Sequence, residues 1–377
     1  MAQVLLLCTL TTKSDEAAYL TAQLEAFGVS VRLIDTSLDS GGRVLDGANK
    51  CLAMESAANR ALAEASAACA QGSEVVLGIG GGTGGEIILQ VLRALPITFP
   101  KVLVTTLPFD PRIAVADNSI VLVPTLADIN GLNAMLRDTF QNAAAMVAGL
   151  TQKSRKGELT DIIPSIGITA LGVTDAAVRP LVARLDTQGH ESTVFHANGY
   201  GGAAYSRFIK AGAFHTLIDL TPHEMTRLHV AGPHVPMRER FSAGSDLPRI
   251  TLPGGLNFFT LTDIATAKAD YRARAHYPHS AYFTHVKLTK EEMVLVTRKL
   301  ADALNAATGP QHLIIPMGGF SSEDGPGGAI EDPVLRTTFH NVMESVLAPH
   351  VNVTVLDDHI SAPHVTDAIL SALTKDT

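Results

Sequence analysis

An apolar segment that runs into a cluster of glycines limits what this chain can fold into. Residues 75–79 have the composition of a buried strand, and residues 86–93 have the apolar spacing of a packed helix. The glycines between them therefore lie at a strand-to-helix turn. Because glycine has no Cβ, the backbone there can approach a ligand closely, and the N–H groups of the first helical turn lack intrahelical acceptors. The segment predicts a binding site for a phosphate or a carboxylate group.

The residues of this loop that we predict to bind the anion are Gly80, Gly81, Gly82, Thr83, Gly84 and Gly85. Three of them match the spacing G-x-G-x-x-G, but they follow the third expected strand, whereas the dinucleotide fingerprint follows the first. The loop also lacks the Lys-Ser/Thr pair of a P-loop. The alternative is a turn that only lets helix and strand pack closely. One or two glycines would serve that purpose, whereas five of the six positions are glycine here.

Composition restricts the class of protein. A chain of 377 residues with 46% hydrophobic and 18% charged residues suits two globular domains. The formal net charge of −8, without a basic cluster, argues against a nucleic-acid partner. No apolar run approaches the ~18 residues that span a bilayer, and the apolar start lacks the flanks of a signal peptide. Three cysteines without metal-like spacing favour a reducing compartment, so we expect a cytoplasmic protein with no membrane partner.

Strand and helix patterns alternate along the whole chain. The strands expected in the first half are 4–8, 29–34, 75–79, 101–105 and 119–123, and the pattern starts again at residue 163. Such alternation predicts parallel sheets with right-handed crossovers. We therefore predict an α/β fold with two Rossmann-like domains and an inter-domain cleft. The polar segment 151–160 is the expected linker, which divides the chain into a Gly-loop domain, 1–155, and a His-rich domain, 156–377.

Polar residues follow the first two strands of the Gly-loop domain. Thr9, Thr12 and Lys13 lie in an expected polar turn after the first strand, and Asp35 follows the second. In open parallel sheets, ligands bind outside the carboxyl ends of the strands. We therefore predict that these residues share a cofactor site with the glycine loop. The alternative for Asp35 is a helix cap or a turn residue.

The histidines indicate that the two halves differ in chemistry. All 14 lie between His190 and His364. The residues of the second half that we predict to carry the chemistry, each near an expected strand end, are His196, Glu224, Ser321, Asp324 and His359. A histidine beside carboxylates suits general acid–base catalysis, and the same set could hold a divalent metal, although no spacing is a metal motif. The alternative is structural, since a histidine at a strand end commonly bonds a nearby carbonyl group.

Several motifs together resemble the tobamovirus-resistance-protein-like ATP-binding family, which comprises poorly characterised bacterial, fungal and plant proteins. The motifs are residues 8–13, 80–85, 95–101, 128–133, 194–202, 217–221 with Glu224, 253–257 and 357–360, and they cover nearly the whole chain. The resemblance implies a nucleotide-binding first domain that takes ATP with Mg²⁺. It also implies that Asn133 contributes to the cofactor site. A homo-oligomer, a dimer or a multiple of one, is implied as well.

The chain departs from the family pattern at two loops. Cys8 and Thr11 stand where the family's first loop has Gly and Asp, so a carboxylate that would serve Mg²⁺ or a ribose is missing. Residues 107–110 read Leu-Pro-Phe-Asp where the family tends to have Ser-Gly-Asp, which leaves open whether Asp110 takes over. These departures favour a divergent small-molecule substrate.

Three functions follow from these observations. The first is a small-molecule enzyme or ATP-binding protein whose glycine loop binds an anionic substrate or cofactor facing a His/carboxylate site. The second is a metal-dependent or acid–base hydrolase or lyase that cleaves an ester or C–C bond of a small carboxylate or oxo substrate without ATP. The third is a non-catalytic protein that binds a partner.

Overall fold

The computed structural model describes residues 3–41, 43–154 and 165–374. By contacts between residues the chain divides into two compact units, Met1–Asp161 and Ile162–Thr377, and each is considered by itself. The predicted boundary between residues 155 and 156 lies outside the described residues. No helix in the described ranges combines the length and apolar character needed to cross a membrane.

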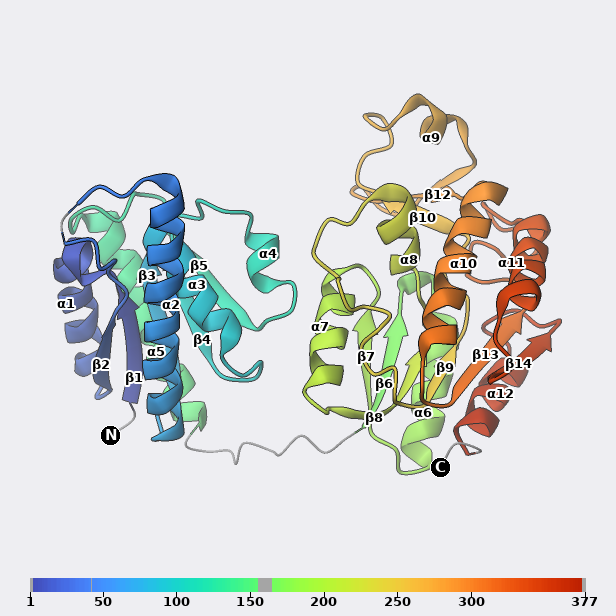
Figure 1. Cartoon of the computed structure of the whole chain (residues 1–377), viewed down its shortest axis with the longest axis horizontal. Helices are drawn as coiled ribbons and strands as arrows, with labels where there is room; N and C mark the ends of the chain where they lie inside the picture. Colours follow the sequence, from blue (N-terminus) through green and yellow to red (C-terminus); the bar gives the residue numbers. More distant parts are fainter. Residues whose placement is uncertain (1–2, 42, 155–164, 375–377) are drawn as a thin grey trace. The chain divides into compact units, whose positions relative to one another are not determined.

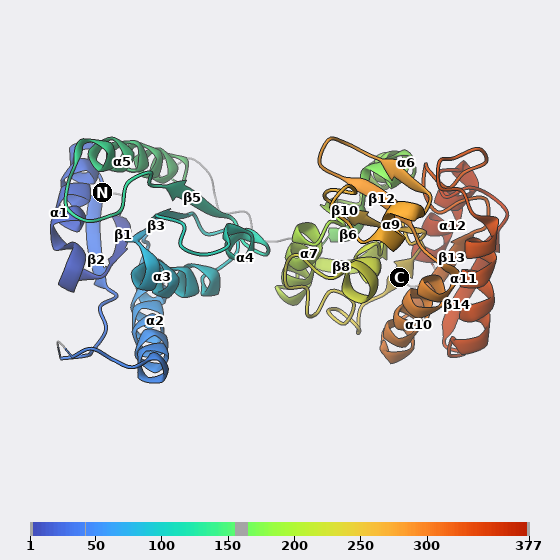
Figure 2. The same cartoon turned by 90° about the horizontal axis from the view of Figure 1, so that it is seen from above.

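The first unit is a five-stranded parallel sheet with helices on both faces (Figures 1 and 2). Its elements are β1 Gln3–Cys8, α1 Leu10–Ala26, β2 Ser30–Asp35, α2 Gly47–Ala70, β3 Val75–Gly80, α3 Gly82–Ala94, β4 Lys101–Thr105, α4 Pro111–Val115, β5 Ile120–Pro124 and α5 Ala134–Ser154. The strand order is β2-β1-β3-β4-β5, and every pair is parallel. The predicted parallel α/β architecture is therefore confirmed for this unit.

Both faces of this sheet are covered, which explains why its central strands are almost continuously apolar. Helices α1 and α5 pack on one face through residues such as Leu20 and Phe140, and α2 and α3 pack on the other through Ala61 and Ile88 (Figure 2). The side of α2 that meets the sheet is made of alanines, so this long helix lies close to the strands. The loops at the carboxyl ends of β1 and β3 stay at the edge of the sheet, where a ligand would bind.

The segment after β1 differs from the prediction. Thr9–Lys13, expected as a polar turn, forms the first turn of α1 instead. The N–H groups of Leu10 and Thr11 donate to the Asp35 carboxylate and the Ser37 hydroxyl, both at 3.1 Å. Because the loop after β2 supplies these acceptors, the helix begins directly after the strand. Lys13 has a φ of −133° and kinks the helix there.

The second unit contains a six-stranded parallel sheet of order β14-β13-β9-β8-β6-β7. Its elements are β6 Ser165–Ala170, η1 Gly172–Thr174, α6 Asp175–Thr187, β7 Ser192–His196, α7 Tyr200–Lys210, β8 Phe214–Asp219, α8 Glu224–Thr226, η2 Arg227–Ala231, β9 Arg249–Thr251, α10 Lys290–Ala306, β13 Gln311–Pro316, α11 Pro333–Val346, β14 Val351–Leu356 and α12 Pro363–Leu373. In chain order, its first five strands repeat the arrangement of the first unit, and a sixth is added. In both units the order reverses between the first and third strands.

An antiparallel sheet is inserted between β9 and α10. It consists of β10 Phe258–Leu261, β11 His276–Pro278 and β12 Thr284–Lys287 in the order β10-β12-β11, and α9 Ala269–Ala273 lies in the connection. These strands are too short for a clear periodic signal, and pairing with β12 stabilises β11. The small sheet lies over the carboxyl ends of β6 and β8 (Figures 1 and 2).

Candidate functional site

The glycine loop forms the predicted strand-to-helix turn between β3 and α3. A Cβ atom at Gly80 would lie 2.5 Å from the backbone nitrogen of Gly85, and one at Gly85 would lie 3.0 Å from the Gly80 carbonyl oxygen. Close packing therefore explains these two glycines. It does not explain Gly82, where a Cβ would have no neighbour within 4 Å, or Gly81, where the nearest atom is the Thr106 hydroxyl oxygen at 3.6 Å. The open positions lie at the start of the helix, where an anion would bind.

Gly84 brings α3 against the loop that follows β1. A Cβ at Gly84 would lie 2.8 Å from the Thr9 hydroxyl oxygen, which is itself 3.2 Å from the Thr36 hydroxyl oxygen. The predicted neighbours Thr9 and the glycine loop thus meet where the strand order reverses between β1 and β3. Ligands of open α/β sheets bind at such a reversal.

Two predicted cofactor residues cap helices. One carboxylate oxygen of Asp35 accepts from the Ser37 N–H and hydroxyl at 2.9 and 2.6 Å, in addition to Leu10. Burial raises the pKa of Asp35, but these hydrogen bonds outweigh it and lower the pKa below its usual value. Asn133 accepts from the Leu136 N–H at 3.0 Å in the first turn of α5. Both residues therefore have a structural role, and their place in a cofactor site stays a prediction.

The other polar residues near this edge add little to the site. The Thr12 hydroxyl lies 3.4 Å from the Thr9 carbonyl oxygen and is exposed, and Lys13 occupies the kink of α1. Asp110 accepts from the Arg112 backbone N–H and is paired with the Arg112 guanidinium, so it is the cap of α4. It does not replace the carboxylate missing at Thr11.

A group of histidines lies at the carboxyl edge of the second sheet. We define the histidine cluster as His196, His223, His279, His285 and Glu323. His196 ends β7, and His223 lies in the loop after β8. The small antiparallel sheet supplies His279 and His285, and the loop after β13 supplies Glu323. The cluster therefore adjoins the strand-order reversal between β6 and β8, the second unit's counterpart of the glycine loop.

Aromatic rings hold the inner part of the cluster in place. The Phe258 ring lies between the rings of His223 and His285, with centroid distances of 4.6 and 4.2 Å. His279 stacks on the outer side of His285 at 4.5 Å. The imidazole of His285 is thus fixed from both sides, whereas His279 is open to solvent on one side.

His223 is fully enclosed and stays neutral. Its Nδ1 lies 2.7 Å from the Gly255 carbonyl oxygen, which can only accept, so Nδ1 carries the proton. Nε2 then accepts from the Thr260 hydroxyl at 3.1 Å. Burial lowers the pKa of His223 to about 3. With both nitrogens engaged, His223 connects the loops rather than exchanging protons.

His285, Glu323 and His279 form the part of the cluster that faces open space. The Nδ1 of His285 lies 2.8 Å from one carboxylate oxygen of Glu323, and the Nδ1 of His279 lies 3.8 Å from the other. His285 and Glu323 are buried, and His279 is partly exposed. A cavity of about 260 Å³ adjoins them, lined by Gly172, Val173, Tyr277, His279, Ser322, Glu323 and Ala329.

His196 lies at the outer side of the cluster. Its side chain is exposed to solvent, but partial burial, followed by the charge of His279, lowers its pKa below the usual value. His196 also contributes to the lowered pKa of His223. The electrostatic neighbours of His196 are thus histidines, and the predicted carboxylates Glu224 and Asp324 are engaged elsewhere.

Glu224 belongs to a buried ion network. Arg240 donates two hydrogen bonds to Asp219 at 2.7 Å and a third to Glu224, and all three side chains are buried. The other oxygen of Glu224 accepts from the Gly199 N–H at 2.8 Å. A Cβ at Gly202 would lie 2.1 Å from Glu224, so a glycine is required there. Glu224 joins the turn after His196 to the end of β8, which gives it a structural role, and its catalytic role stays a prediction.

Asp324 and His359 also hold loops together. Asp324 is fully buried and accepts from the N–H groups of Phe320 and Asp332 and from Arg336. His359 lies with Nε2 2.9 Å from the Ser321 carbonyl oxygen and Nδ1 2.8 Å from the Ser361 hydroxyl. These hydrogen bonds give Asp324 and His359 structural roles, and their catalytic roles stay predictions.

Ser321 differs from these residues. It is fully buried, and its hydroxyl has no hydrogen-bond partner among the described residues. Its loop is joined to the loop after β6 by the hydrogen bond from Ser322 N to Val173 O, at 2.8 Å. The structure thus leaves a chemical role for Ser321 as a prediction.

Comparison with known proteins places the chain in a family. The C-terminal domain of the uncharacterised protein family UPF0261 matches residues 163–376, and its N-terminal domain matches residues 42–156. The chain belongs to this family. It is 30% identical to UPF0261 protein RA0729 of Rhizobium meliloti, over 99% of this chain and 98% of the relative. It is 27% identical to the ToMV resistance protein Tm-1(GCR237) of Solanum lycopersicum, over 79% of this chain and 41% of that longer protein.

Sequence reasoning predicted His196 but missed the other four members of the cluster in this UPF0261 protein: His223, His279, His285 and Glu323. Residues 258–261 and 284–287 are rich in aromatic and β-branched residues, which is a strand signal, and it would have placed His285 on a half-buried strand. Glu323 lies between the predicted residues Ser321 and Asp324. Composition alone does not show which side chain of an irregular loop faces a cavity.

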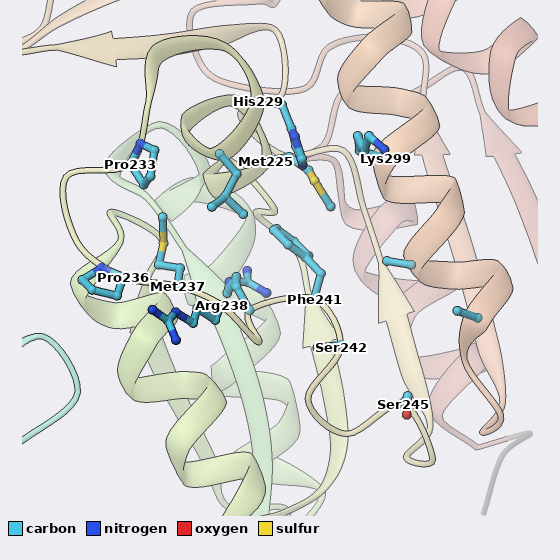
Figure 3. Close-up of a pocket in the computed structure, with 14 residues that line it drawn as sticks. Met225, His229, Pro233, Pro236, Met237, Arg238, Phe241, Ser242, Ser245 and Lys299 are labelled. Atoms are coloured by element: carbon cyan, nitrogen blue, oxygen red, sulfur yellow. The ribbon is translucent and has the colours of Figure 1, made fainter.

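A larger cavity of about 670 Å³ lies elsewhere in the second unit (Figure 3). Its lining comes from η2, the segment before β9 and α10, and includes Met225, Met237, Phe241 and Lys299. No member of the histidine cluster lines it. It is mainly apolar, so we place the candidate chemistry at the smaller cavity.

Proposed function

We propose that the first unit binds an anionic small molecule at the glycine loop, with the phosphates of ATP and its Mg²⁺ as the first candidate. The observation that carries this proposal is the start of α3, where Gly81 and Gly82 leave room that packing does not require. A helix start concentrates backbone N–H groups and the positive end of the helix dipole. The resemblance described under Sequence analysis implies ATP binding, so nucleotide is the first ligand to test.

A pair of matched variants tests the proposal. Gly82 and Gly47 are each the first residue of a helix, and a Cβ at either would meet nothing within 4 Å. Gly82→Asp places a carboxylate where the anion would bind, and Gly47→Asp makes the same change in α2. An aspartate in a first helical turn favours the helix, so neither variant should lose stability.

The assay is calorimetric titration with ATP and Mg²⁺, accompanied by thermal unfolding of each protein. We expect Gly82→Asp to weaken binding by more than about tenfold, since like charges in contact cost well above 1.4 kcal/mol. Gly47→Asp should bind like the parent protein. If the parent gives neither heat nor thermal shift at millimolar nucleotide, the ATP assignment fails. Inorganic phosphate and a small dicarboxylate then test the loop as a general anion site.

The second candidate function is an acid–base or metal-dependent hydrolase or lyase that acts at the histidine cluster. The observation that favours it is the position of His279, His285 and Glu323 beside a 260 Å³ cavity at the carboxyl edge. This edge is where α/β folds place reacting groups. His196, the outermost member of the cluster, is the proposed general base.

Substitution of His196 tests this candidate. Acid–base catalysis by histidine supplies roughly 10²–10⁴-fold, so His196→Ala should lower turnover of an ester or oxo-acid substrate by that order. Because His196 is exposed, the melting temperature should not change. A fall in stability with unchanged activity per folded molecule would show a structural residue instead.

A further inference from the structure

We propose that His279, His285 and Glu323 bind one divalent metal ion of the zinc class. One side-chain donor atom from each of the three lies within 4.8 Å of the others. The inference deepens the second candidate function, since it assigns the metal on which hydrolytic chemistry at this edge would depend. It concerns metal binding itself, which can be measured without a substrate.

The distances between the donor atoms suit a tetrahedral ion. Zinc–nitrogen and zinc–oxygen bonds of about 2.0–2.2 Å at tetrahedral angles place neighbouring donors roughly 3.3–3.6 Å apart. The same carboxylate oxygen of Glu323, Oε1, lies 3.0 Å from the Nδ1 of His285 and 3.8 Å from the Nδ1 of His279, and these two distances bracket that spacing. His279 is partly exposed and stacked on His285, so its ring must rotate to direct a nitrogen at the ion. The required shifts are local to side chains.

The chemistry of the donors selects the ion. Two imidazoles and one carboxylate form a set used in catalytic zinc sites, which keep a fourth position for water or substrate. Magnesium and calcium prefer oxygen ligands, so a set with two nitrogens disfavours them. The free cysteines Cys8, Cys51 and Cys69 all lie in the first unit, so no thiolate of the second unit competes with this set.

The charge of Glu323 favours a cation at this place. Its carboxylate is buried, and among the described residues its side-chain partners are His285 and His279. The nearby cations are used elsewhere, since Lys287 pairs with Asp332 and Arg336 pairs with Asp324. A buried carboxylate without a strong cationic partner is costly. A metal ion would neutralise it.

The surrounding structure holds two of the ligands in place before any ion binds. His285 lies on β12, the central strand of the small sheet, and its ring is stacked on Phe258. The Glu323 carbonyl accepts from the Ile330 N–H at 3.1 Å, and Gly328 packs where a Cβ would lie 2.3 Å from that carbonyl. Metal sites depend on such support for the orientation of their ligands.

The adjoining cavity indicates the size of substrate that the ion would bind. His279 and Glu323 both line the 260 Å³ space, so an ion between them borders it. That volume admits water and a small organic molecule, but it is below the range of about 300–1,000 Å³ typical of drug-sized ligands. The geometry points to a small substrate that offers a carboxylate or carbonyl oxygen to the ion.

The experiment is zinc titration of the full chain after removal of metal with a chelator. Calorimetry and metal analysis should show one tightly bound Zn²⁺ per chain, with a dissociation constant in the micromolar range or below. Glu323→Gln and His279→Ala should each weaken binding by more than about 100-fold, the upper end of the loss expected for an outer-shell partner. Glutamine retains an oxygen that accepts from His285, so this variant should fold normally.

His276→Ala is the matched control. His276 lies on β11, three residues before His279, and its Nδ1 is 2.8 Å from the Arg274 carbonyl oxygen. This variant should bind zinc like the parent. The proposal fails if the parent binds no zinc below millimolar concentration, or if Glu323→Gln and His279→Ala leave the affinity unchanged. Zinc binding without substrate turnover would instead count against the hydrolase candidate and leave the metal site intact.

Discussion

Replacement of Arg240 by leucine should unfold the second unit at a much lower temperature. Arg240, Asp219 and Glu224 are all buried, and the Arg240 guanidinium is ion-paired with both carboxylates. The leucine side chain fits an apolar surrounding, but it removes this shared ion-pair partner, and for Asp219 only the weaker effect of the Arg249 charge remains. The effect should therefore exceed the loss of a surface ion pair, which is worth about 0–1 kcal/mol.

The magnitude follows from the burial of the network. Removing one partner of a buried ion pair costs about 3–5 kcal/mol, because the remaining charge stays in a medium of low polarity. For a unit of this size, 1 kcal/mol corresponds to about 2–4 °C in the melting temperature. We therefore expect a decrease of about 6–20 °C. The melting temperature of Arg240→Lys should lie between those of the parent protein and Arg240→Leu. Lysine keeps the positive charge, but an ammonium group cannot make the paired hydrogen bonds to Asp219.

The pH dependence adds a second readout. In the parent protein, burial raises the pKa of Asp219, but Arg240 outweighs burial and lowers it. The stability that Asp219 contributes is present above its unfolded pKa of about 3.9 and is lost as the pH falls through the folded value. Without Arg240, the largest effect that opposes burial is gone, and only the weaker effects of Arg249 and the Thr169 hydroxyl still lower the pKa of Asp219. The pKa of Asp219 should therefore be higher in the variant, and protonation of the carboxyl group in acid should reduce the cost of the missing guanidinium. The difference in melting temperature should be smaller at pH 5 than at pH 7.

The assay is thermal unfolding followed by circular dichroism, with Arg238→Leu as the control. Arg238 is two residues away and exposed, so its loss should shift the melting temperature by little. A shift for Arg240→Leu no larger than that of Arg238→Leu would refute the reasoning. So would a difference from the parent that does not change with pH.

Two further predictions concern the whole protein. If His196 is the general base, the reaction rate should fall as the pH drops through the pKa of its imidazole. That pKa lies below the usual value of about 6.5, because burial and His279 both lower it. A flat profile from about pH 5.5 to 8 would leave the role unsupported. We also predict that the chain forms a homo-oligomer, a dimer or a multiple of one. Light scattering at micromolar concentration measures this, and a monomeric mass would contradict it.

The local sequence pattern was sufficient to predict most helices and strands of this chain. Strand 101–105 was predicted with the bounds that the structure has, and the strands expected at 4–8, 29–34, 75–79 and 119–123 agree with the structure to within one residue at each end. The reason is that apolar periodicity, prolines and glycines act on neighbouring residues, so they can be read along the chain. The strand-to-helix turn at Gly80–Gly85 was predicted on the same basis.

The hydrogen-bond partners of individual polar residues were decided by the tertiary structure. Asp35 and Glu224 were predicted for a site, but each meets donors from segments distant in sequence, such as Leu10 for Asp35 and Arg240 for Glu224. A carboxylate that accepts hydrogen bonds from such donors holds distant segments of the chain together. Nothing in the sequence around Asp35 or Glu224 shows whether donors will be present.

The sequence by itself determined the two α/β halves, the glycine turn and the restriction of histidine to the second half. Only the tertiary structure decided the order of the strands and the meeting of His279, His285 and Glu323. His285 and Glu323 are separated by 38 positions, and a short antiparallel sheet and an irregular loop bring them to 2.8 Å. Strand order and loop direction depend on packing between distant segments, and that packing leaves no periodic signal in a single sequence.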